Sequence, residues 1–342
     1  MSSKTVLVTG GAGYIGAHTL VELVAAGYRP VVVDDLSRSS KELLVGVEKI
    51  TGTKLPFYPI DCADKEELAK VFQSHSDISG IIHFAAFKSV NESVEKPLLY
   101  FRNNIDSLLS LLEVMLSRKV HRFVFSSSCT VYGQPDVIPV TEAAPFKRPE
   151  SPYGATKQMG ERILEDAVNA FSELRVVSLR YFNPIGAHPT GAIGELPIGV
   201  PNNLVPYVTQ TAIGKRKALT VFGNDYDTPD GSCLRDFIHV VDLAKAHVSA
   251  LTEMDRLPKR FEAFNLGSGV PCSVLELIHT FVKVTGVSVN YSIGPRRPGD
   301  IEKVYADPSK SNRDLKWKTQ LTTEDALRDA WNWEKKLAHA PH

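Results

Sequence analysis

The glycine-rich turn close to the N-terminus constrains the fold more than any other feature of the sequence. It joins an apolar run at 5–10, TVLVTG, to a helical pattern at 14–27 that ends at a glycine. Gly10, Gly13 and Gly16 have the spacing G-x-x-G-x-x-G in this turn. Because glycine has no Cβ, the backbone can approach a pyrophosphate, and the amide groups at the start of the following helix attract it. A glycine-rich turn that binds nothing is the alternative, but the place of this turn between a strand and a helix favours a dinucleotide-binding βαβ unit.

Apolar runs and helical patterns alternate along the first half of the chain. Short strands separated by helices imply a parallel sheet with helices on both faces. After about Asn183, proline and glycine become dense, which indicates a smaller, loop-rich lobe. We therefore predict an α/β fold, with a Rossmann-type doubly wound parallel sheet over 1–183, returning segments near 236–270, and a smaller mixed C-terminal lobe over 184–342. The further strands predicted are 29–35, 54–61, 80–86, 121–128 and 174–182, with helices at 65–75, 96–119 and from Pro152.

Charge and cysteine content argue against several classes of protein. Lysine plus arginine and aspartate plus glutamate number 39 each, so no net field draws the chain to nucleic acid or to an anionic membrane. No run approaches the ~20 apolar residues of a membrane span, and no cleavable apolar segment precedes the first strand. Cys62, Cys129, Cys233 and Cys272 are far apart and form no C-x-x-C pair, which is typical of reduced thiols. We expect a soluble, cytoplasmic protein that binds neither nucleic acid nor membrane.

Acidic residues follow the second and third predicted strands, at the edge where a dinucleotide would lie. Asp34 and Asp35 come about 20 residues after the glycine turn, where a carboxylate meets the ribose hydroxyls of the adenosine half. A carboxylate there repels a 2′-phosphate, so the predicted cofactor is NAD rather than NADP. Asp34 is the preferred candidate, since Asp35 could be a solvated loop charge. Asp61 is placed to approach the adenine.

A tyrosine and a lysine lie four residues apart in SPYGATK, on one face of the helix that begins at Pro152. A free tyrosine has a pKa near ~10, and lowering it to ~7 takes about 4 kcal/mol of preferential phenolate stabilisation. Lys157 and the positive ring of a bound NAD are of the right order to supply it at Tyr153. By itself, the pattern Y-x-x-x-K usually indicates two surface residues on a helix. Ser126 and Ser128 end the fifth strand at the ligand-binding edge, however, and Ser128 could bind the substrate hydroxyl whose proton Tyr153 accepts.

These motifs together resemble the extended short-chain dehydrogenase/reductase family. The stretches GGAGYIGAHT, FAAFKSVNES, SSSCTVYG, LRYFNPIGAHPTG, PNNLVPY, FGNDYDTPDGSCLRDFIHVVDLA and NLGSG extend over nearly the whole chain and are similar to the UDP-glucose/UDP-galactose 4-epimerases within it. The resemblance implies reversible C4 epimerisation of UDP-galactose and UDP-glucose through a transient 4-keto sugar, with tightly bound NAD. It also implies that the lobe over 184–342 binds the nucleotide sugar. The helix at 96–119 and the Tyr153 helix would form a homodimer interface.

The resemblance assigns roles to residues of this sequence. Tyr153 is the base, Lys157 its electrostatic partner and Ser128 the group that orients the sugar hydroxyl. Arg235 and Arg297 would supply cations for the pyrophosphate, because guanidinium groups suit phosphate oxygens. The implied cofactor-binding residues are Gly10, Gly13, Tyr14, Ile15, Gly16, Asp34, Asp61, Cys62, Phe84, Ala85, Lys88, Asn103, Ser126, Tyr153, Lys157 and Tyr181. The implied substrate-binding residues are Lys88, Ser128, Tyr153, Asn183, Asn203, Leu204, Arg235, Arg297, Asp300 and Val304.

The sequence leaves alternatives open for both the substrate range and the type of reaction. Val304 stands where relatives restricted to glucose and galactose can carry tyrosine, so the resemblance implies activity also on UDP-N-acetylglucosamine and UDP-N-acetylgalactosamine. A nucleotide-sugar 4,6-dehydratase starts with the same oxidation but needs an acid beside the serine that ends the fifth strand. The sequence there reads Ser128-Cys129-Thr130, without one. A non-catalytic NAD-binding protein is the remaining alternative, and intact Tyr153 and Lys157 argue against it.

No metal site is predicted. Asp236, His239 and Asp242 could suggest a ligand cluster, but their spacing spreads them around a helix, and no further histidine or cysteine completes four ligands. A structural polar network is the preferred interpretation of these three residues.

Overall fold

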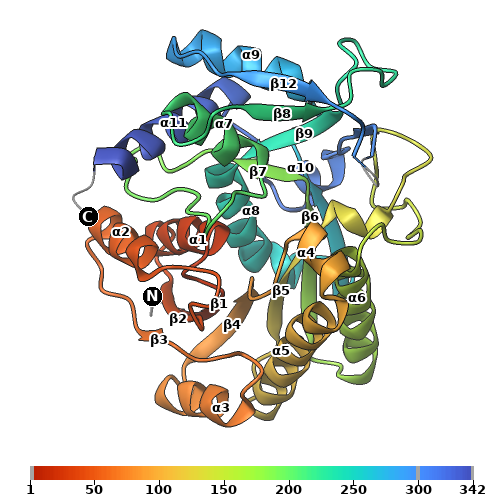
Figure 1. Ribbon diagram of the computed structural model, residues 1–342. Coiled ribbons are helices and arrows are strands. Elements are labelled where there is room, and N and C mark those ends of the chain that lie inside the picture. Colours follow the sequence, from red (N-terminus) through yellow and green to blue (C-terminus); the bar gives the residue numbers. More distant parts are fainter. Residues whose placement is uncertain (1–3, 298–300, 340–342) are drawn as a thin grey trace.

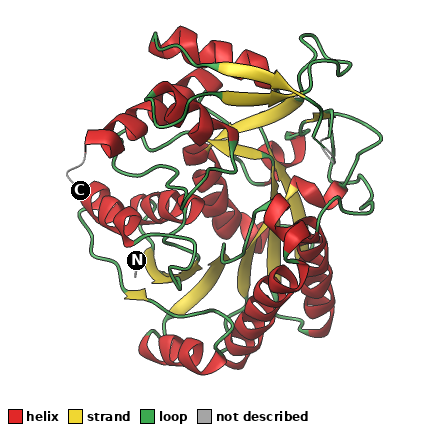
Figure 2. Cartoon of the chain, in the orientation of Figure 1, coloured by secondary structure: helices red, strands yellow, loops and turns green. Residues whose placement is uncertain are grey.

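The computed structural model describes residues 4–297 and 301–339. Its main layer is a seven-stranded sheet in the order β10-β6-β5-β4-β1-β2-β3, in which every pair of neighbours is parallel. Helices cover both faces of this sheet, and smaller sheets lie to one side of it (Figure 1, Figure 2). The predicted α/β class, with a Rossmann-type sheet and a smaller mixed C-terminal part, is confirmed. The strands of the main sheet are β1 (Thr5–Thr9), β2 (Arg29–Val33), β3 (Phe57–Tyr58), β4 (Ile78–His83), β5 (Arg122–Ser128), β6 (Arg175–Tyr181) and β10 (Phe261–Leu266).

The main sheet separates two hydrophobic cores, because alternate residues of a strand point to opposite faces. On β1, Val6 and Val8 belong to one core and Leu7 to the other. A strand buried on both faces reads as a continuous apolar run, which explains the pattern TVLVT. One face is covered by α1 (Tyr14–Ala25), α2 (Lys41–Thr51) and α8 (Val240–Glu253), and the other by α3 (Lys65–Ser74), α5 (Pro97–Ser117) and α6 (Pro152–Ala170) (Figure 1).

The later part of the chain builds two smaller sheets. Their apolar sides pack in a third core with three helices. One sheet is centred on β9 (Leu234–His239), which pairs in parallel with β7 (Asn183–Ile185) and β13 (Lys303–Val304) and antiparallel with β11 (Pro271–Ser273). The other is the parallel pair of β8 (Leu219–Phe222) and β12 (Tyr291–Gly294). The helices are α7 (Leu204–Ala212), α9 (Val274–Thr285) and α11 (Thr323–His339), and the remaining short elements are α4 (Val90–Glu95), α10 (Ser309–Asp314) and the 3-10 turns η1 (Cys129–Tyr132) and η2 (Met254–Arg256).

The chain returns to the main sheet after building β9. Helix α8 packs on α1, and β10 extends the main sheet beyond β6. The returning segments predicted near 236–270 therefore divide: α8 and β10 lie in the layers of the main sheet, whereas β9 belongs to a smaller sheet. Within residues 4–297 and 301–339, no helix is both long and apolar enough to cross a membrane.

Two segments around the edge of the main sheet differ from the sequence prediction. The strand predicted at 54–61 shrinks to β3, an edge strand that pairs with β2. Helix α2 occupies a segment for which no element is predicted, although its ends carry local signals. The Ser40 hydroxyl accepts a hydrogen bond from the first turn, and Gly52 ends the helix with a φ of 67°. Gly46 interrupts the apolar pattern because a Cβ there would lie 2.3 Å from the Ala192 oxygen.

Candidate active site

The glycine turn folds tightly between β1, α1 and the chain that leaves β4. Gly10 has a φ of 69°, in the left-handed region, and a Cβ on it would lie 2.6 Å from the Ala85 nitrogen. A Cβ on Gly16 would lie 2.3 Å from the Gly10 oxygen, so α1 packs against the turn at a distance that requires glycine. Gly13 is the N-cap of α1, and no side chain in the described part of the chain caps this helix. The first amide groups of α1 therefore keep hydrogen-bonding capacity for an anion.

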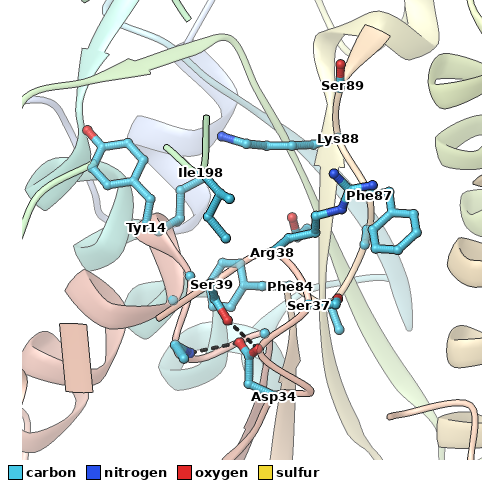
Figure 3. Close-up of a pocket in the computed structure, with 18 of the residues that line it drawn as sticks. Tyr14, Asp34, Ser37, Arg38, Ser39, Phe84, Phe87, Lys88, Ser89 and Ile198 are labelled. Carbon is cyan, nitrogen blue, oxygen red and sulfur yellow. Dashed lines mark hydrogen bonds between the residues drawn. The ribbon is translucent and has the colours of Figure 1, made fainter. Parts of the chain in front are cut away.

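A cavity of about 290 Å³ extends from this turn along the carboxyl ends of the central strands (Figure 3). This edge of a doubly wound sheet is where such folds bind ligands. Tyr153 and Lys157 of α6 are among the residues that line the cavity. Every residue predicted to bind the cofactor lines the cavity, namely Gly10, Gly13, Tyr14, Ile15, Gly16, Asp34, Asp61, Cys62, Phe84, Ala85, Lys88, Asn103, Ser126, Tyr153, Lys157 and Tyr181.

Asp34, just after β2, binds three donors at one end of the cavity (Figure 3). Its carboxylate accepts hydrogen bonds from the Ala12 amide at 3.0 Å, the Leu36 amide at 3.0 Å and the Ser39 hydroxyl at 2.6 Å. Burial raises the pKa of Asp34, and these hydrogen bonds lower it. The carboxylate therefore joins the glycine turn to the loop that follows β2. The neighbouring Asp35 is exposed and accepts hydrogen bonds within its own loop.

Helix α6 presents Tyr153 and Lys157 side by side because they lie four residues apart along it. The Ser151 hydroxyl caps the helix by accepting a backbone hydrogen bond at 3.2 Å. The Lys157 Nζ lies 5.9 Å from the centre of the Tyr153 ring and donates to the Ser126 carbonyl at 2.6 Å. All these side chains are buried, as is Ser128 at the end of β5. The residues predicted to be catalytic are thus brought together on α6 and β5.

The protein's own groups change the acidity of these side chains in a way that the sequence does not predict. Burial raises the pKa of Tyr153, and the hydrogen bond with the Ser128 hydroxyl lowers it. Burial lowers the pKa of Lys157 to about 7, while the charge of Glu161 raises it. Removal from water disfavours both the phenolate and the ammonium, and the Lys157 ammonium is directed at a carbonyl. The lowering of the Tyr153 pKa expected from Lys157 is therefore not supplied by the protein groups alone.

The sheet centred on β9 gathers residues predicted to bind the nucleotide sugar. Arg235 on β9 pairs in register with Val304 on β13, and Asn183 on β7 pairs two residues further along β9. The Asn183 Oδ1 is buried and has no hydrogen-bond partner among the described residues, so a donor on a ligand would satisfy it. Val304 belongs to the same apolar cluster as Cys129, which follows Ser128. The β9 sheet thus approaches the end of β5.

Some of the residues predicted to bind the substrate line the cavity, and the others lie outside it. Lys88, Tyr153 and Asn203 line the cavity. Ser128, Asn183, Leu204, Arg235, Arg297 and Val304 are not among its lining residues, and Asp300 lies outside the described residues.

Lys88 and Asn103 line the cavity and have partners within the protein. The Lys88 Nζ lies 3.5 Å from a Glu195 carboxylate oxygen, and Asn103 donates to the Asn104 side chain at 2.9 Å. Glu195 also accepts from Asn203. This ion pair joins the chain after β4 to the segment before α7, and both of its residues line the cavity.

Other lining residues are not identified by the sequence analysis. The Arg38 guanidinium lies 4.8 Å from the centre of the Phe87 ring and donates to Glu92 at 2.8 Å. Arg38 follows Asp34 closely in the sequence. Its position near the predicted ribose site is a signal by which it could have been identified. Ile198 lines the other side of the cavity, beside Lys88 (Figure 3). It lies in a stretch rich in proline and glycine, where no periodic pattern distinguishes it.

The three residues considered for a metal site take part in hydrogen-bonded networks. Asp236 accepts from the Ser268, Gly269 and Ala306 amides, and Asp242 accepts from two amides just before α11. His239 accepts a hydrogen bond at the start of α8. Across the described ranges, no group of three potential metal ligands is present.

Comparison with known proteins supports the same interpretation of the cavity as its geometry does. The family described as "NAD dependent epimerase/dehydratase family" matches residues 6–267. The chain belongs to this family. It is 50% identical over 329 residues to the UDP-glucose 4-epimerase of Bacillus subtilis, with 96% of each chain covered. The resemblance inferred from the motifs is confirmed.

Solved structures agree with this membership of the NAD dependent epimerase/dehydratase family. A UDP-glucose 4-epimerase from Bifidobacterium longum, in complex with NAD+ and UDP, has a TM-score of 0.93 at 47% identity, covering 97% of this chain and 98% of that one. A UDP-glucose-4-epimerase from Stenotrophomonas maltophila, with bound NAD and formylated UDP-arabinopyranose, has a TM-score of 0.95 at 46% identity, covering 99% and 100%.

The cavity suits the cofactor of an NAD dependent epimerase/dehydratase. The glycine turn and the first residues of α1 line the cavity, so the uncapped amide groups at the start of α1 can meet a pyrophosphate there. Asp34 and Lys157 both line the cavity, and the position of Asp34 after β2 suits ribose hydroxyls. The predicted cofactor, NAD, is confirmed by the family.

Proposed function

We propose that this protein interconverts UDP-glucose and UDP-galactose by reversible epimerisation at C4, through a transient 4-keto sugar. The observation that carries the proposal is that Tyr153 and Lys157 line the dinucleotide cavity, while the sheet that holds Asn183, Arg235 and Val304 approaches the end of β5. A nucleotide sugar anchored on that sheet would present its hexose to Tyr153. Similarity to UDP-glucose 4-epimerases over nearly the whole chain supports the same reaction.

The side chains divide the chemistry among them. NAD, when bound, accepts a hydride from the sugar carbon and returns it. The Tyr153 Oη removes the proton from O4, and the Ser128 hydroxyl holds O4 beside it. Lys157 contributes positive charge next to the phenolate. Arg235 and Arg297 bind the pyrophosphate, so that the keto sugar can turn and expose the opposite face of C4 to the returning hydride, while Tyr153 gives the proton back to O4.

An assay with UDP-galactose and no added NAD tests this function. The purified protein should form UDP-glucose without net oxidation, because the cofactor returns to its starting state. The Tyr153→Phe variant should lose roughly a thousandfold in kcat, the range that a positioned general base contributes. Undiminished C4 inversion in that variant would refute the mechanism.

The same assay separates the alternative functions. A 4-keto-6-deoxy product would indicate a 4,6-dehydratase, for which the chain lacks an acid at Cys129 or Thr130 beside Ser128. No turnover at all would indicate a non-catalytic NAD-binding protein.

The substrate range extends to UDP-N-acetylglucosamine and UDP-N-acetylgalactosamine. Val304 supports this part of the proposal, since a valine beside the end of β5 occupies less space than the tyrosine of more restricted relatives. Val304→Tyr should abolish turnover of the N-acetylated sugars and spare UDP-galactose. If the wild-type protein turns over UDP-galactose fully and UDP-N-acetylglucosamine not at all, the proposed range is wrong.

The proposal includes a homodimer in the cytoplasm. Leu98 and Leu109 on α5 and Met159 on α6 are 80%, 40% and 47% exposed, which supports an apolar contact between two copies of this helix pair. The absence of disulfides among the described cysteines supports a reducing compartment. A monomeric mass in sedimentation at micromolar concentration would count against the dimer.

A further inference from the structure

A buried ion pair lies behind the catalytic side chains, on the same face of α6. Tyr153, Lys157 and Glu161 are spaced four residues apart and form a row along the helix. Glu161 is 3% exposed, and Arg180 on β6 is 6% exposed. The Arg180 guanidinium binds the Glu161 carboxylate through Nε at 2.9 Å and Nη2 at 2.6 Å. The Ser127 hydroxyl donates to the same carboxylate at 2.6 Å.

These contacts fasten α6 to the centre of the main sheet. Ser127 on β5 and Arg180 on β6 are direct partners in the parallel register, so the Glu161 carboxylate spans one pair of residues in two adjacent strands. The residues on either side of Ser127 are Ser126, whose carbonyl accepts from Lys157, and Ser128. Sliding α6 along the sheet would break the Glu161 contacts and also separate Tyr153 from Ser128.

The charges around Lys157 are few. Burial lowers the pKa of His83 to about 3, so this histidine is neutral. Burial raises the pKa of Tyr153 and of Tyr181, so both phenols are neutral unless a further positive charge acts on them. Of the groups named here, Glu161 is the negative one that acts on Lys157. The titratable and charged groups that interact with these side chains or with Arg180 include His83 on β4, Tyr100 on α5, Cys129 and Tyr132 in η1, Tyr181 on β6, and Glu142, whose carbonyl binds Arg180.

We propose that Glu161 is a positioning residue for the epimerisation: held by Arg180 and Ser127, its carboxylate keeps α6 in register with β5 and keeps Lys157 in its ammonium form. This inference rests on the proposed function, since Lys157 acts there through Tyr153. The charge matters because burial alone disfavours the ammonium, and opposite charges attract strongly where water is excluded. The ammonium in turn stabilises the Tyr153 phenolate.

Removing the Glu161 charge should affect both catalytic side chains. In Glu161→Gln the buried Arg180 keeps its positive charge without a counter-charge, so it repels the Lys157 ammonium. Lys157 then loses its proton at lower pH, so the Tyr153 phenolate loses its positive partner at lower pH as well. Because the reaction needs a deprotonated Tyr153 beside a protonated Lys157, the alkaline limb of the activity profile should move to lower pH.

The test compares kcat against pH for wild type, Glu161→Gln and Glu161→Asp, each with its NAD content measured. The aspartate keeps the negative charge on a shorter side chain, whereas the glutamine keeps the side-chain shape and removes the charge. We expect the alkaline limb of the kcat profile to move about one pH unit or more toward lower pH in Glu161→Gln and to stay near its wild-type position in Glu161→Asp. If Glu161 mattered for packing alone, both variants would change in melting temperature, and neither limb of the plot of kcat against pH would shift.

A second measurement does not depend on turnover. The midpoint of the Lys157 ¹³Cε titration, followed by NMR in the NAD-loaded protein, should fall in Glu161→Gln and remain in Glu161→Asp. If Glu161→Gln does not fold, Glu161→Gln/Arg180→Met removes both buried charges and should shift the midpoint in the same direction by a smaller amount. An unchanged Lys157 midpoint or an unchanged pH profile in Glu161→Gln would overturn the inference about Glu161. Inactivity of the wild type would instead overturn the proposed function, and the NMR titration would then decide the inference about Glu161.

Discussion

Replacing Asp34 with asparagine should weaken NAD binding about a hundredfold while leaving the catalytic end of the cavity in place. The Asp34 carboxylate serves three donors, with one oxygen accepting from the Ala12 amide and the other from the Leu36 amide and the Ser39 hydroxyl. An asparagine that keeps its oxygen toward Leu36 and Ser39 turns its NH₂ group toward the Ala12 N–H. A buried donor without a partner costs about 1–3 kcal/mol, and the two remaining hydrogen bonds lose the strengthening that a charged acceptor provides.

The total is about 3 kcal/mol, which corresponds to roughly a hundredfold in an equilibrium constant. It acts on NAD affinity because the same hydrogen bonds hold the glycine turn in its binding geometry. Calorimetric titration of NAD into protein freed of its cofactor would measure the change. Asp35→Asn is the matched control, since Asp35 is exposed and binds Ser37 in its own loop. Affinity within threefold of wild type in Asp34→Asn, or equal damage in Asp35→Asn, would refute the reasoning.

Other predictions concern the glycine turn and the buried titratable groups. Gly16→Ala places a Cβ 2.3 Å from the Gly10 oxygen, so the NAD content of the purified protein should fall roughly tenfold, and an undiminished content would contradict the close approach. The pKa of Lys157 is about 7 in the folded protein against an ordinary 10.5, so its stabilising contribution is present above about pH 10.5 and lost as the pH falls toward 7. In urea unfolding of cofactor-free protein, wild type should therefore gain stability relative to Lys157→Met between about pH 7 and pH 9, and parallel curves would disprove this. His18 and His83 have a pKa lowered to about 3 by burial, so stability that is present above pH 6.5 should be lost on acidification, as urea midpoints at pH 7 and pH 5.5 would reveal.

The cofactor cavity could be predicted from the sequence because its motifs are local and follow from the simple topology of a parallel sheet. The spacing of Gly10, Gly13 and Gly16 is contiguous in the chain, and Asp34 follows after one helix and one strand. Parallel strands bring their carboxyl ends to one edge, so residues that follow each strand meet without further information. Tyr153 and Lys157 could be found for the same reason, because a four-residue spacing on a helix fixes their proximity.

The parts that could not be predicted depend on contacts between distant segments. Gly46 looks like a helix breaker in the sequence, and its role becomes visible only beside Ala192. The pairing of Lys88 with Glu195 joins segments more than a hundred residues apart, and no pattern in either segment indicates it. The acidity of Tyr153 depends on burial, which the spacing of the motif does not contain.

The acidity of the catalytic pair links proton transfer to the occupancy of the site. Burial raises the pKa of Tyr153 and lowers that of Lys157, so removal from water disfavours the charged form of both side chains. The same exclusion of water strengthens every charge that remains, because Coulomb interactions grow as the local dielectric falls. A carboxylate behind Lys157 and a positive ring in front of Tyr153 would therefore act with more force here than at the surface, and both are needed to reverse what burial does. A proton acceptor built in this way is weak until the cofactor is in place, so the site gains its basicity at the moment when a hydride acceptor is available.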